Sequence, residues 1–140
     1  MFKQADTNQE SLEIQKNERL VGYKMLDILQ VIGPPEMIKI IIDVDFIVFT
    51  STTAAFSIKN KNKYSVGVNI SKITGNRDFF AHIAHECAHI YNGDCDSSFT
   101  VSTALCGEKI RERELKAEKL AGKWVSYILV EYEKLTGQII

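Results

Sequence analysis

Residues 76–93, NRDFFAHIAHECAHIYNG, predict one amphipathic helix that carries all three histidines of the chain. Asn76 is a suitable N-cap, Asp78 suits the positive end of the helix dipole, and Gly93 suits the position just past the last turn. One side of this helix repeats apolar residues at intervals of three and four, namely Phe80, Ile83, Cys87 and Ile90. The histidines and Glu86 fall on the other side, so one face gathers the titratable groups.

His85, Glu86 and His89 form the pattern His-Glu-x-x-His, in which two imidazoles lie one helical turn apart. Two histidines at this spacing can bind one zinc ion, and the glutamate between them can reach a water bound to that ion. A shuffled chain of this composition contains the pattern roughly once in two hundred sequences. The alternative is a surface helix that happens to carry two histidines. We favour a zinc site with Glu86 as general base, because a second feature of the chain points the same way.

That second feature is a candidate for the third protein ligand, which a catalytic zinc site needs beside its two histidines. Residues 108–135 predict one long helix with a repeating apolar pattern, formed by Ile110, Ala117, Ala121, Trp124, Ile128 and Leu135. Glu114 falls inside this pattern, so we expect its carboxylate to be buried. A buried carboxylate is unfavourable unless it is paired or binds a metal, which makes Glu114 the predicted ligand. Glu118, one turn later, is predicted to accept a hydrogen bond from a ligand histidine.

Alternatives to this ligand set stay open on the sequence alone. Glu114 could instead pair with a neighbouring arginine or lysine. Cys95 lies six residues after the second histidine, where metzincins place their third ligand, but those enzymes need a glycine where this chain has Asn92. Cys87 and Cys106 are predicted to be small core residues. No group that would stabilise an oxyanion is evident, and the candidates are His82, Tyr91 and Tyr127.

The rest of the chain predicts two shorter helices and three strands. Residues 18–32 have apolar residues spaced by three and four and end before Gly33, and the segment after the two prolines suits a short helix. Strands are predicted over residues 46–50, 54–58 and 64–70, the last two forming a hairpin. If the 64–70 strand is a free edge beside the cleft, it is expected to align an extended substrate by β-addition.

Composition favours one globular domain with a protein substrate. The chain has 140 residues, of which 45% are hydrophobic and 25% charged, as in ordinary folded domains. We predict a flexible polar tail over residues 1–16 and a single α+β domain over residues 17–140. This domain is expected to be a minimal zincin-like fold, with about three main helices packed on a small three-stranded antiparallel or mixed sheet.

Charge and cysteine content bear on partners and location. The net charge of −1 provides no basic surface for a phosphate backbone or an anionic membrane, so neither nucleic acid nor a membrane is an expected partner. Three cysteines without a CxxC pair, and without a secretory signal, are typical of a reducing compartment. We therefore expect a cytoplasmic protein.

Residues 84–89, AHECAH, followed by residues 114–121, ELKAEKLA, resemble the ImmA/IrrE family of gluzincin metallopeptidases. That family has Ala-His-Glu-x-x-His and then Glu-x-x-Ala, followed by Asp or Asn. The resemblance covers roughly residues 64–130 and implies that Glu114 is the third zinc ligand, with Glu118 in the Asp or Asn position. The Leu-Leu-Met-Pro that commonly follows in the family is replaced here by residues 124–129, WVSYIL.

The resemblance also implies a biological role. Members of this family are cytoplasmic proteins of bacteria, phages and mobile elements, and they often act on helix-turn-helix repressors. The implied activity is that of a zinc metalloendopeptidase that hydrolyses peptide bonds of such a protein. The alternative is a regulator-binding or toxin–antitoxin module that keeps a zinc site and cleaves nothing, although a merely structural site has no use for Glu86.

Overall fold

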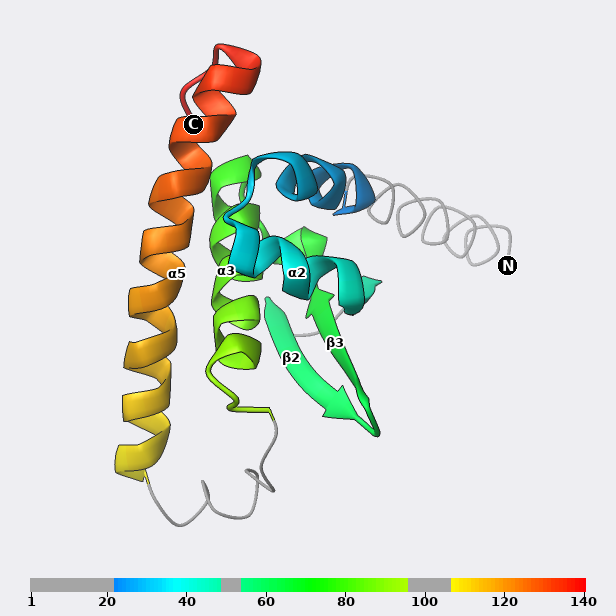
Figure 1. Cartoon of the computed structure of the whole chain (residues 1–140), viewed down its shortest axis with the longest axis vertical. Coiled ribbons are helices and arrows are strands. Elements are labelled where there is room, and N and C mark those ends of the chain that lie inside the picture. Colours follow the sequence, from blue (N-terminus) through cyan, green and yellow to red (C-terminus); the bar gives the residue numbers. More distant parts are fainter. Residues whose placement is uncertain (1–21, 49–53, 96–106) are drawn as a thin grey trace, which may run out of the picture.

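A small three-stranded sheet with helices packed against it forms the fold (Figure 1). The computed structural model describes residues 22–48, 54–95 and 107–140. In chain order its elements are a helix over residues 22–32, α2 (Pro35–Asp43), β1 (Asp45–Val48), β2 (Ala55–Asn60), β3 (Lys63–Val68), the short 3-10 helix η1 (Ile70–Lys72), α3 (Asn76–Tyr91) and α5 (Gly107–Thr136). The predicted α+β class with a mixed sheet is confirmed. The tail predicted over residues 1–16 lies outside the described residues.

The motif helix α3 begins one residue earlier than predicted. Asn76 is its first helical residue, and Gly75 is the N-cap. The φ of Gly75 is +93°, a conformation that favours glycine, so the chain turns into the helix one residue before Asn76. The predicted place of Asp78 in the first turn is confirmed, and its carboxylate accepts a hydrogen bond from the backbone N–H of Thr74 at 2.9 Å.

The order of the strands is β1-β3-β2, with β3 parallel to β1 and antiparallel to β2. The expectation that the strand over residues 64–70 is a free edge is therefore wrong, because β3 has a neighbour on each side. Burial gives the reason: residues 65–68 are all buried, as a central strand requires, whereas residues 58–60 of β2 are exposed. In the described part of the chain, β2 is the edge strand next to α3.

The predicted hairpin joins β2 to β3 through a turn at Lys61 and Asn62, and Lys61 has a positive φ of 60°. Phe56 pairs with Gly67 in the register of this hairpin. The ring of Phe56 lies across Gly67 so closely that a Cβ added there would come within 2.1 Å of it. Gly67 thus lets the aromatic ring cover the central strand.

The core lies around α3, which packs against α5 on one side and against β2, β3 and α2 on the other (Figure 1). Its largest fully buried side chains include Phe79, Phe80 and Ile83 from α3, Val66 and Val68 from β3, and Ile128 from α5. Cys87 is also fully buried, as predicted for a core residue. Among the described helices, none combines the length and apolar character that a membrane crossing requires.

Candidate metal centre

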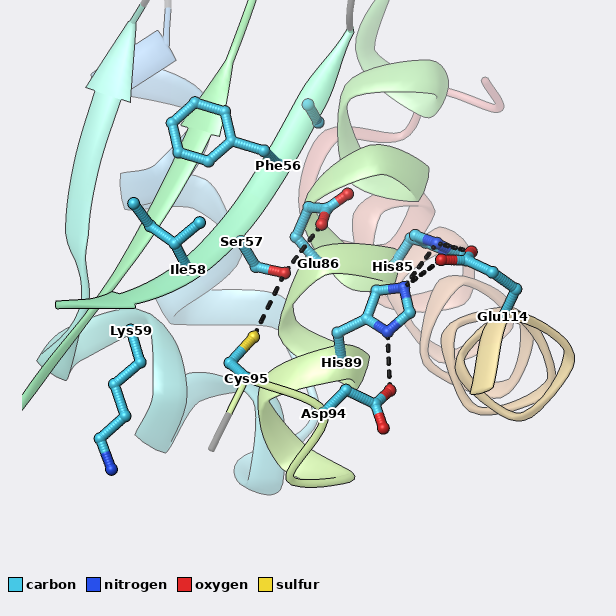
Figure 2. A pocket seen from close by; sticks show the side chains of 11 residues that line it. Phe56, Ser57, Ile58, Lys59, His85, Glu86, His89, Asp94, Cys95 and Glu114 are labelled. Carbon is cyan, nitrogen blue, oxygen red and sulfur yellow. Dashed lines mark hydrogen bonds and ion pairs between the residues drawn. The ribbon is translucent and has the colours of Figure 1, made fainter. Parts of the chain in front are cut away.

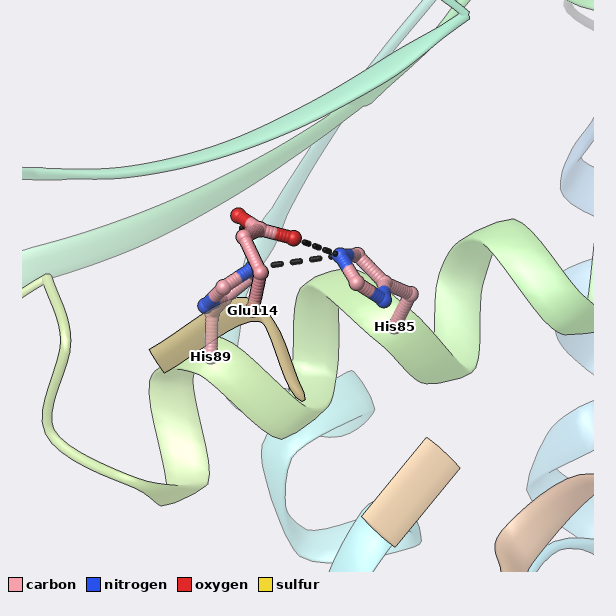
Figure 3. A group of neighbouring side chains, drawn as sticks. All are labelled: His85, His89 and Glu114. Atoms are coloured by element: carbon pink, nitrogen blue, oxygen red, sulfur yellow. Dashed lines mark hydrogen bonds and ion pairs between the residues drawn. The ribbon is translucent and has the colours of Figure 1, made fainter. Parts of the chain in front are cut away.

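Three predicted ligands come together where α3 and α5 face each other (Figure 3). Glu114 Oε2 lies 2.9 Å from His85 Nε2, and Glu114 Oε1 lies 3.0 Å from His89 Nε2. The two Nε2 atoms are 3.1 Å apart. One ligand atom from each residue can be chosen so that all three lie within 4.8 Å of one another. This group could hold a metal ion.

The local structure explains why these side chains meet. His85 and His89 are four residues apart in α3, so both project from one side of the helix. Ala117 is buried and has a side chain small enough to let α5 lie close to α3. Glu114 precedes Ala117 by one turn of α5, and its carboxylate reaches across to both imidazoles (Figure 3).

Glu114 lies beside the two histidines, as predicted, but the prediction that its carboxylate is buried is wrong. Its side chain is 49% exposed, whereas those of His85 and His89 are 25% and 11% exposed. The apolar pattern of α5 becomes buried only from Ala117 onward, so Glu114 stands at the rim of the site. Its charge is partly solvated, and burial alone does not demand a metal ion there.

Glu118 does not make the contact predicted for it. It is exposed on α5, and within the described residues it forms no hydrogen bond with either histidine. Asp94 takes that role instead, since its Oδ2 lies 2.7 Å from His89 Nδ1. A carboxylate thus lies beside one of the two histidines, but it belongs to Asp94 and not to Glu118.

Asp94 is placed by the way α3 ends. Gly93 has a φ of +79°, which confirms it as the residue just past the helix. Its N–H bonds to the carbonyl of Ile90 at 3.1 Å, and the N–H of Asp94 bonds to the carbonyl of His89 at 3.0 Å. These two bonds form a Schellman motif, which turns the chain back and brings Asp94 beside the imidazole of His89.

Glu86 lies in the same cavity as the ligands (Figure 2). This cavity has a volume of about 430 Å³, within the range of small-molecule and peptide sites. It is bounded by β2, by the polar side of α3, and by Asp94, Cys95 and Glu114. Glu86 is only 9% exposed, and its Oε1 accepts a hydrogen bond from Ser57 Oγ of β2 at 2.9 Å. Sequence reasoning missed Ser57, because nothing in the local pattern links it to a residue 29 positions away.

The other candidates do not join the three ligands. His82 Nε2 lies 3.4 Å from Asp78 Oδ1, and His82 does not line the cavity. Tyr91 and Tyr127 line a different cavity, beside Trp124, so neither is placed to stabilise an oxyanion at the metal group.

The two described cysteines lie in different places, one at the cavity and one in the core. Cys95 lines the cavity, but its Sγ contacts Ser57 Oγ at 3.7 Å and it is not part of the three-ligand group. Burial, with the charge of Glu86 as a smaller cause, strongly raises the pKa of the Cys87 thiol, so this residue stays a protonated core residue and not a nucleophile. Cys106 lies outside the described residues.

No protein-family model, curated protein or solved structure matches the chain. The resemblance to the ImmA/IrrE family therefore stays a prediction that rests on the motif residues themselves.

Proposed function

We propose that this chain is a zinc-dependent metalloendopeptidase that hydrolyses peptide bonds of a cytoplasmic protein. The observation that carries the proposal is the convergence of His85, His89 and Glu114 in one cavity with the carboxylate of Glu86. Two imidazoles and one carboxylate are the protein ligands of several zinc peptidases, which keep a fourth position open. The resemblance of the motif to the ImmA/IrrE family agrees with this chemistry.

The spacing of the donor atoms fits zinc. Tetrahedral zinc holds its nitrogen and oxygen ligands at about 2.0–2.1 Å, which places neighbouring ligand atoms about 3.3 Å apart. The two Nε2 atoms are 3.1 Å apart, Glu114 Oε2 lies 2.9 Å from that of His85, and Glu114 Oε1 lies 3.0 Å from that of His89. With one ligand atom from each residue, all three lie within 4.8 Å of one another, close enough to hold one ion. When bound, zinc polarises a carbonyl group and lowers the pKa of a water molecule to about 7.

Glu86 is the proposed general base. It is adjacent to His85 in sequence, it faces the cavity, and the hydroxyl of Ser57 fixes one of its oxygens (Figure 2). A carboxylate held in this way can take a proton from the attacking water and pass it to the nitrogen of the leaving group. A purely structural metal site has no use for such a group, which is why we favour an enzyme over a regulator-binding module.

The strand β2 is the proposed binding edge for an extended peptide, in place of the strand over residues 64–70. The N–H of Asn69 bonds to the carbonyl of Ala54 at 2.8 Å, so residues 54, 56 and 58 make the hydrogen-bonded pairs with β3. The backbone groups of Ala55 and Ser57 then point away from β3, along the border of the cavity. A peptide added there would run along the cavity that His85, His89 and Glu114 line.

The test compares wild-type protein with Glu86→Gln. We expect wild-type protein to purify with about one zinc ion per chain and to cleave a protein substrate, with helix-turn-helix repressors as the first substrates to try. Glu86→Gln should keep its zinc and lose cleavage by a factor of about 10² or more. A matched control is Glu112→Gln, because Glu112 is exposed on α5 and does not line the cavity. Equal cleavage by wild-type protein and Glu86→Gln would refute the proposed mechanism.

A further inference from the structure

We propose that Asp94 is a positioning residue for the metal centre, which fixes the ring of His89 so that its Nε2 faces the ion. This inference rests on the proposed function, since it assumes that the ligand group binds zinc. Asp94 lies outside the His-Glu-x-x-His pattern and outside every helix predicted from the sequence.

Asp94 contacts His89 at two points. Its carboxylate lies 2.7 Å from Nδ1 of the imidazole, and its backbone N–H bonds to the carbonyl of His89 at 3.0 Å. A carboxylate in its ionised form can only accept a hydrogen bond, so an ionised Asp94 requires the tautomer of His89 in which Nδ1 is the donor. The lone pair that remains for a metal is then on Nε2, the atom that faces His85 and Glu114.

Burial makes this contact strong. The side chains of His89 and Asp94 are 11% and 10% exposed, so little water competes for the hydrogen bond. The Schellman motif that ends α3 already fixes the backbone of both residues. Few additional rotatable bonds therefore lose their freedom when the contact forms. By contrast, His85 is 25% exposed, and it contacts Glu114 and His89 through Nε2 and packs its ring at right angles to that of His89. The two ligand histidines are therefore unequal, and His89 is the more firmly oriented.

Asp94 also connects the two helices that supply the ligands. Its Oδ1 lies 3.9 Å from Nε of Arg113, the residue that directly precedes Glu114 in α5. One oxygen of this carboxylate thus faces His89, and the other faces the residue next to Glu114 in α5. Removing its charge should loosen the ring of His89 and weaken the approach of α5.

The protein contains its own comparison pair. Asp78 and His82 also form a carboxylate–imidazole contact, at 3.4 Å, on the same helix but away from the ligand group. Asp78→Asn therefore removes a carboxylate charge beside a histidine without touching the proposed centre, and it also weakens the hydrogen bond from Thr74 N–H at the start of α3. Any general effect of losing such a pair should be seen in both variants.

The experiment measures zinc affinity of the full chain by competition with a chromophoric chelator, for wild-type protein, Asp94→Asn and Asp78→Asn. We expect Asp94→Asn to bind zinc 10- to 100-fold more weakly, as for other carboxylates that support a ligand histidine, and Asp78→Asn to match wild type. Circular dichroism checks that both variants are folded. A second readout is the ring N–H proton of His89 in zinc-loaded protein labelled with ¹⁵N-histidine. It should exchange slowly in wild type and rapidly in Asp94→Ala.

The outcomes separate the two proposals. If wild-type protein binds zinc and Asp94→Asn binds it equally well, the role of Asp94 is refuted and the proposed function stands. Equal losses in Asp94→Asn and Asp78→Asn would also refute it, because they would indicate a general loss of stability. If wild-type protein binds no zinc, the proposed function fails and this inference fails with it.

Discussion

Ser57 Oγ of β2 donates a hydrogen bond to Glu86 Oε1 of α3 over 2.9 Å. This bond joins the edge of the sheet to the helix that carries both proposed histidine ligands. Glu86 is 9% exposed, so the hydroxyl is one of the few partners that can orient its carboxylate. The sheet edge therefore borders the cavity and also sets the direction of the proposed base.

Ser57→Ala should lower the rate of peptide hydrolysis by about tenfold, because a hydrogen bond to a charged group contributes about 1.5–3 kcal/mol and its loss frees the carboxylate to rotate. Zinc content should not change, since Ser57 is not a ligand. The measurement is kcat together with elemental analysis. Ser126→Ala is the control, because that exposed hydroxyl of α5 bonds only to a backbone carbonyl of its own helix. An unchanged kcat in Ser57→Ala would show that Glu86 needs no such partner.

Glu114→Ala should lose most of the bound zinc, because two imidazoles alone hold the ion weakly. In wild-type protein, zinc at 100 times its Kd should stabilise the fold by about 2.7 kcal/mol. Addition of zinc should therefore raise the Tm of the wild type and leave the Tm of Glu114→Ala nearly unchanged. Glu112→Ala, two residues away and exposed, should behave as wild type. Full zinc retention by Glu114→Ala would exclude it as the third ligand.

Gly93→Ala should destabilise the protein by about 1–2 kcal/mol, because its φ of +79° is unfavourable for a residue with a Cβ. It should also weaken zinc binding, since Gly93 directs Asp94 toward His89. Gly122→Ala is an instructive counterpart. Gly122 lies inside α5 with nothing within 4 Å of an added Cβ, so this change should stabilise the fold by about 0.5–1 kcal/mol. Thermal denaturation of both variants, with opposite signs of ΔTm, checks the prediction.

Gly67→Ala should destabilise the fold by about 1–3 kcal/mol, because the new methyl group would overlap the ring of Phe56. A double variant that also carries Phe56→Ala should be less destabilised than the sum of the two single changes. Denaturant unfolding of the four proteins measures this coupling. Strict additivity would mean that the ring moves aside freely in the native protein.

Much of α3 and α5 could be predicted because their signals are local. The spacing of His85 and His89 and the break in the apolar pattern at Glu114 are visible in the sequence, and helical periodicity converts both into positions on a face. The burial of Glu114 could not be read in the same way. It depends on where the surface of the folded chain ends, and the pattern of α5 continues past that limit.

The contacts that were missed depend on tertiary geometry. The link between Ser57 and Glu86 follows from the strand order, and the parallel pairing of β1 with β3 has no signature in a hairpin pattern. The position of Asp94 was more accessible to prediction, because it depends on a local pattern. Gly93 was correctly predicted to end α3, and a Schellman motif places the next residue near the carbonyl of His89. The predicted cap at Gly93 could therefore have indicated that Asp94 lies near His89.

The partial exposure of Glu114 has a consequence for how the ion would be acquired. With nearly half of its side chain in solvent, this ligand can swing outward while His85 and His89 remain in place on α3. The ion then has an entry path into the folded chain, and loading need not wait for synthesis or refolding. A chelator could then reach the ion in the folded protein, so removal of zinc should not require unfolding.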